Sequence, residues 1–375
     1  MPLAKHIGAT IITTICATTA TGANMTLAEA YADHFYIGAA ISRHLFNPEQ
    51  AETRALAASQ FNSITAENEM KWQSLNRTRG EYRFEDADNF VRFGVENDMY
   101  IVGHVLFWHN QTPAWLFEDD DGNPVSSEVL LDRMRAHVRK LAERYGDYVH
   151  AWDVINETFN DDGSLRDSPW TRILGEAFIE HAFRIAEEEL PSDVELLYND
   201  YSMTRSGRRD AVVRMVNDLQ SKDIRIDGVG MQGHWARTEP NIRQIESSIL
   251  AFAETGVQVH ITELDIDMLP RHPRMWSGNA DVMLRLQEDP ALDPYTEGLT
   301  PESQAALAER YESIFQLFLK HSDSIRRVTF WGVTDADSWL NNWPIRGRTS
   351  HPLLFDRQNN PKPAFHTILT LPEKQ

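Results

Sequence analysis

The chain has 375 residues, of which 42% are hydrophobic and 25% are charged, and these ordinary globular proportions argue against a disordered chain, a collagen-like repeat or a coiled coil. Its 36 basic and 56 acidic residues give a net charge of −20, which disfavours nucleic acid or an anionic membrane as a partner. A single cysteine, Cys16, excludes an intramolecular disulfide and a cysteine-based zinc site.

The first 25 residues have the order of a secretory signal peptide. Lys5 and His6 precede a short apolar run over residues 7–17, and small residues follow over 18–24. The many threonines also fit a disordered leader. Neither this run nor any later one reaches the ~18 apolar residues of a membrane span. We therefore expect a signal peptide or disordered leader over 1–25 and one domain over 26–375. The protein would be secreted or periplasmic, or intracellular if the leader is not cleaved.

Strand-like and helix-like patterns alternate along the rest of the chain. Runs rich in Val, Ile, Phe and Tyr predict eight strands, over residues 35–40, 63–68, 100–108, 150–156, 195–199, 228–234, 257–265 and 327–334. Between them, apolar residues recur every three to four positions, for example over 130–145, 212–219, 242–252 and 307–318. This alternation predicts an α/β protein with a single (β/α)8 TIM barrel. An open doubly wound sheet is the alternative, but no dinucleotide-binding glycine motif follows the first strand, and there is no P-loop.

Polar side chains gather where the predicted strands end, which is the face of such a barrel that carries chemistry. Each predicted strand after the first ends in groups that can bind a polyol or move a proton. In chain order these are Glu67, Asn68 and Lys71; His104, Trp108 and His109; Asn156 and Glu157; Asn199 and Tyr201; Gln232 and His234; Glu263 and Asp265; and Trp331, Asp335 and Trp339.

Two of these residues, Glu157 and Glu263, stand out as a catalytic pair. Strands four and seven face each other across a barrel, so both carboxyl groups should point into its mouth. Glycosidic bond cleavage needs two carboxyl groups, one to protonate the leaving oxygen and one to attack the sugar carbon or activate water. Both glutamates follow apolar strand sequence, where an unpaired carboxylate would be costly to bury. The acidic runs at 118–121 and 187–189 lack such a context, and we expect them to be solvated.

Metal-dependent chemistry has little support in the sequence. There is no H-x-H and no H-E-x-x-H. His104 and His109 are five residues apart, so on one extended strand they face opposite ways and cannot chelate one ion. We therefore expect no metal and no cofactor.

Seven segments, each at a predicted strand end and in the same order, resemble the glycoside hydrolase family 10 endo-1,4-β-xylanases over nearly all of residues 27–371. They are TAENEMKW (65–72), GHVLFWH (103–109), WDVINE (152–157), YNDYS (198–202), GVGMQGHW (228–235), VHITELD (259–265) and TFWGVTDADSW (329–339). The resemblance implies a (β/α)8 barrel that hydrolyses xylan by a retaining double displacement.

The resemblance also implies a role for each matching residue. Glu157 would be the general acid/base and Glu263 the nucleophile. Asn156 would bond the sugar hydroxyl next to the reacting carbon, and His234 would orient Glu263 with Asp265 behind it.

The remaining matches would bind substrate. Gln232, His104 and Trp108 would line the cleavage subsite. Glu67, Asn68 and Lys71 would hold the next sugar toward the non-reducing end. Trp331 and Trp339 would form an aromatic wall over these two sugars, with Tyr201 on the leaving-group side.

Two segments depart from the family pattern. Residues 268–298 and 340–352 form unusually long loops after strands seven and eight, both on the active-site face. The partners expected are xylan and xylo-oligosaccharides, with no nucleic acid, no membrane and a monomeric chain. The rival readings are another β-1,4-glycanase of the cellulase or mannanase type on the same fold, and a non-catalytic carbohydrate-binding barrel. The segments ENEMKW and WGVTD speak against the first, and the presence of both carboxylates speaks against the second.

Overall fold

A computed structural model describes residues 25–275 and 280–374. Its strands are β1 (Tyr36–Ile41), β2 (Ser63–Ala66), β3 (Tyr100–Trp108), β4 (Ala151–Asn156), β5 (Glu195–Asp200), β6 (Gly228–Met231), β7 (His234–Ala236), β8 (Gln258–Asp267) and β9 (Ile325–Phe330). Each strand from β1 to β5 pairs in parallel with the next one, β6 pairs with β8, β8 with β9, and β9 with β1. The sheet therefore closes into a parallel barrel of eight strands, with β7 as a short extension beside β8.

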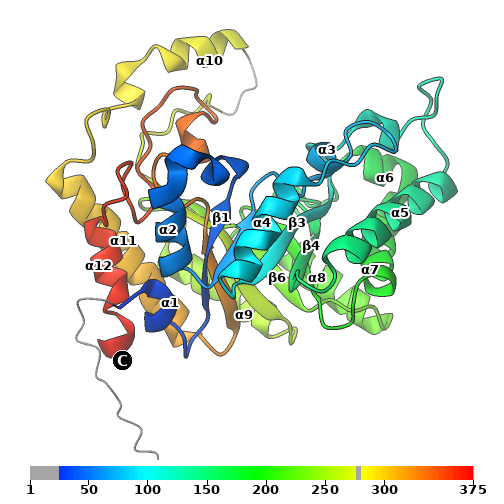
Figure 1. Cartoon of the computed structure of the whole chain (residues 1–375), viewed down its shortest axis with the longest axis horizontal. Coiled ribbons are helices and arrows are strands. Elements are labelled where there is room, and N and C mark those ends of the chain that lie inside the picture. The colour runs from blue at the N-terminus through cyan, green and yellow to red at the C-terminus, as the bar shows by residue number, and fades with distance from the viewer. Residues whose placement is uncertain (1–24, 276–279, 375) are drawn as a thin grey trace, which may run out of the picture.

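Helices surround this barrel (Figure 1). They are α1 (Leu27–Ala30), α2 (Ala51–Gln60), α3 (Trp72–Leu75), α4 (Glu85–Glu96), α5 (Ser127–Tyr145), α6 (Pro169–Leu174), α7 (Phe178–Glu189), α8 (Ser206–Ser221), α9 (Ile242–Ala253), α10 (Ala280–Gln287), α11 (Pro301–Lys320) and α12 (Pro363–Leu369). The prediction of a (β/α)8 barrel is confirmed. Among the described residues, no helix has both the length and the apolar character needed to cross a membrane.

Helices α5 and α11 combine a side-chain cap at their N-terminus with a buried stripe. The Ser126 side chain accepts a hydrogen bond from the backbone of Val129 and so caps α5, while Thr300 caps α11 in the same way. The buried residues of α5 recur every three to four positions and include Leu130, Met134, Val138 and Leu141. Most strand residues are buried, as expected for parallel strands covered by helices.

The sixth predicted strand, 228–234, differs from the expectation. It is not continuous, because β6 ends at Met231 and β7 begins at His234. Gly233 between them has a φ of +85°, a left-handed conformation that glycine adopts without steric cost. Gln232 and His234 therefore do not lie on one continuous strand, although the sequence predicts one strand over 228–234. The turn at Gly233, and not the pleat, directs these two side chains.

The long loop after β8 and the long loop after β9 pack against each other. Met275, Leu286 and Leu292 from the loop after β8 pack with Ile345 from the loop after β9 in a small apolar cluster of their own. Asp293 Oδ1 also accepts a hydrogen bond from the Thr349 backbone at 2.8 Å. In Figure 1, α10 of the first loop stands above the other helices.

A buried ion pair ties the C-terminal helix to the barrel. Lys362, at the start of α12, donates from Nζ to both oxygens of Asp335, at 3.1 and 2.9 Å, and to the backbone oxygen of His351 at 3.0 Å. Asp335 is fully buried and also accepts from the backbone of Leu353 at 2.9 Å. Removal of the ammonium group would therefore leave a buried carboxylate without its counter-charge.

We predict that Lys362→Met lowers the free energy of unfolding by about 3–5 kcal/mol, because the Asp335 carboxylate would remain buried without its counter-charge. Adding Asp335→Asn removes that charge and should recover part of the loss. Denaturant unfolding measures both, with Arg172→Met as a matched control, since the Arg172–Asp167 pair is exposed. A Lys362→Met variant as stable as the control would contradict this account.

Candidate active site

Two glutamates lie at the carboxyl ends of strands on different sides of the barrel. Glu157 directly follows β4 and is half-buried, and Glu263 lies within β8 and is buried. The Glu157 carboxylate accepts from Gln232 Nε2 at 2.9 Å and from Trp108 Nε1 at 3.0 Å. The Glu263 carboxylate is 2.8 Å from Asn199 Nδ2 and 3.0 Å from His234 Nε2. Each carboxylate is thus held by two separate side chains.

Side-chain amides connect the two glutamates. Asn156 Oδ1 accepts from Gln232 Nε2 at 3.2 Å and from Asn199 Nδ2 at 3.1 Å. The same two donors also bond Glu157 and Glu263, respectively, so a continuous chain of hydrogen bonds joins the carboxylates. Since buried polar groups are costly when unpaired, this network favours one arrangement of the site.

His234 lies between two carboxylates. Its Nδ1 is 2.9 Å from Asp265 Oδ2, and its Nε2 is 3.0 Å from Glu263 Oε2. Both ring nitrogens can donate only when the imidazole is protonated. Burial disfavours this cation, but the charges of Asp265 and Glu263 and their hydrogen bonds outweigh burial and raise the pKa of His234 to about 10. The ring is therefore an imidazolium at neutral pH.

The protonated ring in turn favours the charged form of Glu263. Burial alone would raise the pKa of this carboxyl group. The hydrogen bond and charge of His234, with smaller contributions from His104 and Asn199, overcome that effect and hold the pKa of Glu263 below its usual value. Glu263 is therefore an anion over the neutral range.

His104 lies beneath the site on β3. It is buried, and its Nδ1 is 2.7 Å from Asp153 Oδ2 on the neighbouring strand β4. Its ring centroid lies 5.7 Å from that of Trp331 and 6.4 Å from that of Trp108. The structure thus brings these three predicted site residues together.

Residues of the loop after β2 form a second polar group beside Trp108. Lys71 Nζ donates to Asn68 Oδ1 at 3.0 Å and lies 4.9 Å from the ring centroid of Trp108. Asn68 Nδ2 donates to Glu67 Oε1 at 3.2 Å. Burial and the nearby Glu69 raise the pKa of Glu67 to about 7, against the opposing charge of Lys71.

Trp339 contacts the charged cluster directly. Its indole Nε1 donates to Asp265 Oδ2 at 2.8 Å, and its ring centroid lies 4.8 Å from that of His234. The sequence predicts Trp339 only as part of a wall over the sugars. In the structure it also binds the carboxylate that pairs with His234.

A groove of about 910 Å³ extends from this part of the site. Its lining includes Glu67, Asn68 and Trp339, together with Arg43 and Gln111. It lies among the loops that follow β1, β2, β3 and β9. The groove is polar and open, which suits a hydrated, extended ligand.

Tyr201, just after β5, is linked to the Glu157 backbone through Arg166. Its hydroxyl accepts from the Arg166 guanidinium at 2.7 Å, and the Arg208 guanidinium lies 4.0 Å from its ring centroid. Every site residue predicted from the sequence therefore falls in one connected region at the carboxyl ends of the strands.

Two residues of the site were missed by sequence reasoning. The strand-end pattern marks Asn199 only as a polar residue, although it bonds Glu263 and Asn156. The strand-end rule could have found it. Arg166 lies in a loop with no periodic pattern, so no signal in a single sequence identified it.

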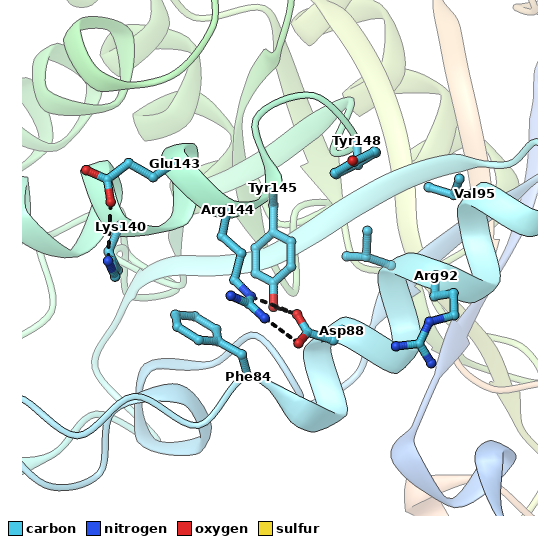
Figure 2. A pocket seen from close by; sticks show the side chains of 10 residues that line it. Phe84, Asp88, Arg92, Val95, Lys140, Glu143, Arg144, Tyr145 and Tyr148 are labelled. Atoms are coloured by element: carbon cyan, nitrogen blue, oxygen red, sulfur yellow. Dashed lines mark hydrogen bonds and ion pairs between the residues drawn. The ribbon is translucent and has the colours of Figure 1, made fainter.

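A hollow between α4 and α5, about 610 Å³ in volume, is remote from this chemistry (Figure 2). The Asp88–Arg144 ion pair crosses it, and the guanidinium also lies 4.4 Å from the Phe84 ring centroid. None of the predicted site residues lines this hollow. Within the described ranges, no group of three or more His, Cys, Asp or Glu side chains is placed to hold a metal ion.

Comparisons with known proteins agree on one family. The model of "Glycosyl hydrolase family 10" matches residues 26–371. "Endo-1,4-beta-xylanase A" of Xylanibacter ruminicola is 40% identical over 93% of this chain and 94% of its own length. "Endo-1,4-beta-xylanase" of Geobacillus stearothermophilus is also 40% identical, over 92% of this chain and 98% of its own length.

Solved structures show the same relationship. A GH10 endoxylanase from a sugarcane soil metagenome is 43% identical, covers 92% of this chain and 99% of its own, and superposes with a TM-score of 0.87. Xylanase XynB from Paenibacillus barcinonensis, solved with a conduramine derivative, is 38% identical over 92% of this chain and 98% of its own, with a TM-score of 0.82. The intracellular xylanase TsXylA of Thermoanaerobacterium saccharolyticum, solved as a mutant in complex with xylotriose, is 32% identical over 92% and 99%, with a TM-score of 0.79.

The raised pKa of His234 predicts a pH-dependent stability. An unfolded histidine titrates near pH 6.5, whereas His234 in the folded chain titrates near pH 10. The stabilisation by the imidazolium is therefore fully present below about pH 6.5 and is lost as the pH rises through about 10. The difference in unfolding free energy between the wild type and His234→Gln should shrink over this window.

Denaturant unfolding from about pH 6 to about pH 10.5 measures this difference across the window between the two pKa values. His366→Gln is the control for the loss of a histidine, because His366 is exposed on α12. A difference for His234→Gln that stays constant with pH would show that the ring is not held as a cation.

Proposed function

The chain belongs to glycosyl hydrolase family 10, and on that premise we propose that it is a retaining endo-1,4-β-xylanase with Glu263 as nucleophile and Glu157 as general acid/base. The observation that carries these roles is the difference between the two carboxylates. Glu263 is buried and faces the His234 imidazolium, which favours its anion. Glu157 is half-buried, and among the described residues its carboxyl group accepts hydrogen bonds from the neutral side chains of Gln232 and Trp108.

The first step forms a covalent glycosyl–enzyme. A Glu263 oxygen attacks the anomeric carbon of the bound xylose, and the bond to the leaving oxygen breaks. The Glu157 carboxyl group donates its proton to that oxygen, so the shortened xylan chain departs as an alcohol.

The second step releases the sugar. Glu157, now a carboxylate, takes a proton from water, and the water oxygen attacks the anomeric carbon from the face that the leaving group occupied. The bond to Glu263 breaks and restores its carboxylate. Two inversions retain the configuration, and this mechanism needs carboxyl groups ~5–5.5 Å apart.

The surrounding residues have proposed roles in binding. Asn156 would bond the hydroxyl next to the reacting carbon, because no described residue accepts from its Nδ2. His104, Trp108 and Gln232 would line the cleavage subsite. Tyr201 would contact the sugar on the leaving-group side.

The next sugar toward the non-reducing end would lie on Glu67, Asn68 and Lys71, at the start of the 910 Å³ groove. Trp331 and Trp339 would close over these two sugars. Xylose lacks the hydroxymethyl group of glucose, so a closed aromatic wall would accept xylose and reject the bulkier ring.

We also propose where the catalytic domain begins, where the protein is located in or outside the cell, and that it is a monomer. Residues 26–375 would form the catalytic domain, and the chain would act as a monomer on xylan and xylo-oligosaccharides. The leader over 1–25 would direct secretion, but nearly all of it lies outside the described residues. N-terminal sequencing of protein recovered outside the cells tests the leader, and an uncleaved intracellular protein would contradict it.

Substitution of each glutamate separates their roles. Glu263→Ala should abolish turnover of xylan and of activated aryl xylosides alike, because no covalent intermediate can form. Glu157→Ala should lower turnover of xylan by about 10²–10⁴-fold, the usual contribution of a positioned acid or base. With a good aryl leaving group it should form the intermediate and then stall. Azide, which needs no base, should restore turnover and give a β-glycosyl azide, as measured by phenol release and NMR.

Two results would contradict the assignment. If azide rescues Glu263→Ala and not Glu157→Ala, the two roles are reversed. If neither variant loses more than about tenfold, where about 10²–10⁴-fold is expected, the pair is not catalytic and the alternative of a carbohydrate-binding barrel returns.

Trp339→Ala tests the proposed aromatic wall. It should lower activity on xylan and raise the relative activity on carboxymethylcellulose, changing the ratio by about tenfold, since one carbon group in a tight pocket is worth roughly 10–200-fold. Trp339→Phe is the matched control, because it keeps a ring but loses the hydrogen bond to Asp265. If the ratio moves equally in both variants, the hydrogen bond and not the wall sets the preference. If neither moves it, the wall lies elsewhere.

A further inference from the structure

The peptide unit between Glu157 and Thr158 is held by hydrogen bonds at both its carbonyl and its N–H. Glu157 has a φ of +60°, a left-handed conformation that is unfavourable for a residue with a side chain. Its N–H donates to the Asn199 backbone at 2.9 Å. Its carbonyl accepts from Arg166 Nε at 2.9 Å, and the N–H of the same peptide unit, from Thr158, donates to Tyr198 Oη at 3.2 Å. These bonds offset the cost of the conformation that aims the carboxyl group into the cleft.

Arg166 uses a second nitrogen to bind Tyr201. One terminal nitrogen donates to the Tyr201 hydroxyl at 2.7 Å. Tyr201 is itself fixed, because its backbone oxygen accepts from the buried Arg208 at 2.7 Å and its ring stacks on that guanidinium. Arg166 therefore links the loop after β4, which carries Glu157, to the loop after β5.

A short hairpin fixes the position of Arg166. Its backbone N–H donates to the Thr158 oxygen at 2.8 Å, and its backbone oxygen accepts from Thr171 Oγ1 at 2.8 Å. At the tip, Gly163 has a φ of +84°, and a Cβ there would lie 2.5 Å from the Gly207 oxygen, so this turn packs closely on α8. The hairpin thus presents the guanidinium at a defined place.

We propose that Arg166 is a positioning residue for the acid/base step: its planar fork sets the backbone of Glu157 and the hydroxyl of Tyr201 at one fixed separation. This inference rests on the proposed role of Glu157. A guanidinium can reach two acceptors in a fixed geometry, whereas a lysine ammonium is a single point on a flexible stem. A small displacement of a catalytic group can cost about 10²-fold in rate.

The test uses the full-length chain with xylan and with 2,4-dinitrophenyl β-xylobioside. Arg166→Met and Arg166→Lys should each lower kcat on xylan by about 10- to 100-fold, with KM little changed. On the aryl substrate both should keep the initial burst of phenol, because that step needs no acid. The later steady state should be slower, and azide should accelerate it and give a β-glycosyl azide.

Two further variants keep the test decisive. Tyr201→Phe removes only the hydroxyl that anchors the fork, so it should show the same pattern to a smaller degree even if Arg166→Met does not fold. Arg172→Met is the matched control, because this arginine lies nearby in α6 but forms only an exposed ion pair, and it should behave as the wild type.

The outcomes distinguish this inference from the proposed function. If azide fails to rescue Glu157→Ala, the assignment of the acid/base is wrong. If azide rescues Glu157→Ala but accelerates neither the Arg166 variants nor Tyr201→Phe, only the role of Arg166 is overturned. Wild-type kcat in Arg166→Lys would likewise overturn it, because charge without the fork would then be sufficient.

Discussion

The site depends on one charged arrangement, the imidazolium of His234 held between the carboxylates of Asp265 and Glu263. A buried carboxylate is normally driven toward its neutral form. Here the neighbouring cation reverses that tendency, and Asp265 in turn keeps the ring charged. The anionic form of Glu263, the proposed nucleophile, is thus maintained at a buried position by the fixed charges of neighbouring side chains.

Several features of the fold serve this arrangement. Glu263 and Asp265 are two residues apart on β8, so the pleat puts both on one face. The turn at Gly233 ends β6 and begins β7, which pairs His234 with Asp265 across the ladder. Trp339 then binds the same oxygen of Asp265 that His234 uses. His234, Asp265 and Trp339 come from three segments far apart in the chain and meet at the Asp265 carboxylate. A substitution of any of the three should therefore affect Glu263.

The sequence predicted the barrel and the two glutamates because their signals are local. Strand runs ending in polar residues identify both the architecture and the face that carries chemistry, and Glu157 and Glu263 follow from that rule. The sequence could not predict the features that arise only when the strands close into a barrel and distant segments meet. The break at Gly233, the packing of Ile345 against the loop after β8 and the reach of Arg166 across two loops depend on distances between segments that no single-chain pattern encodes. The sequence places Trp339 near the sugars, but its bond to Asp265 depends on how the chain folds.

Glu263 is proposed to form the covalent bond to the sugar. A 2-deoxy-2-fluoro-β-xylobioside with a dinitrophenyl leaving group should inactivate the enzyme, because fluorine slows both steps and the good leaving group speeds only the first. Peptide mass spectrometry of the inactivated protein then locates the sugar. One label per chain is expected on the peptide that contains Glu263, and no label is expected in Glu263→Ala. A label on Glu157 or on any other residue, or inactivation of Glu263→Ala at the wild-type rate, would contradict it.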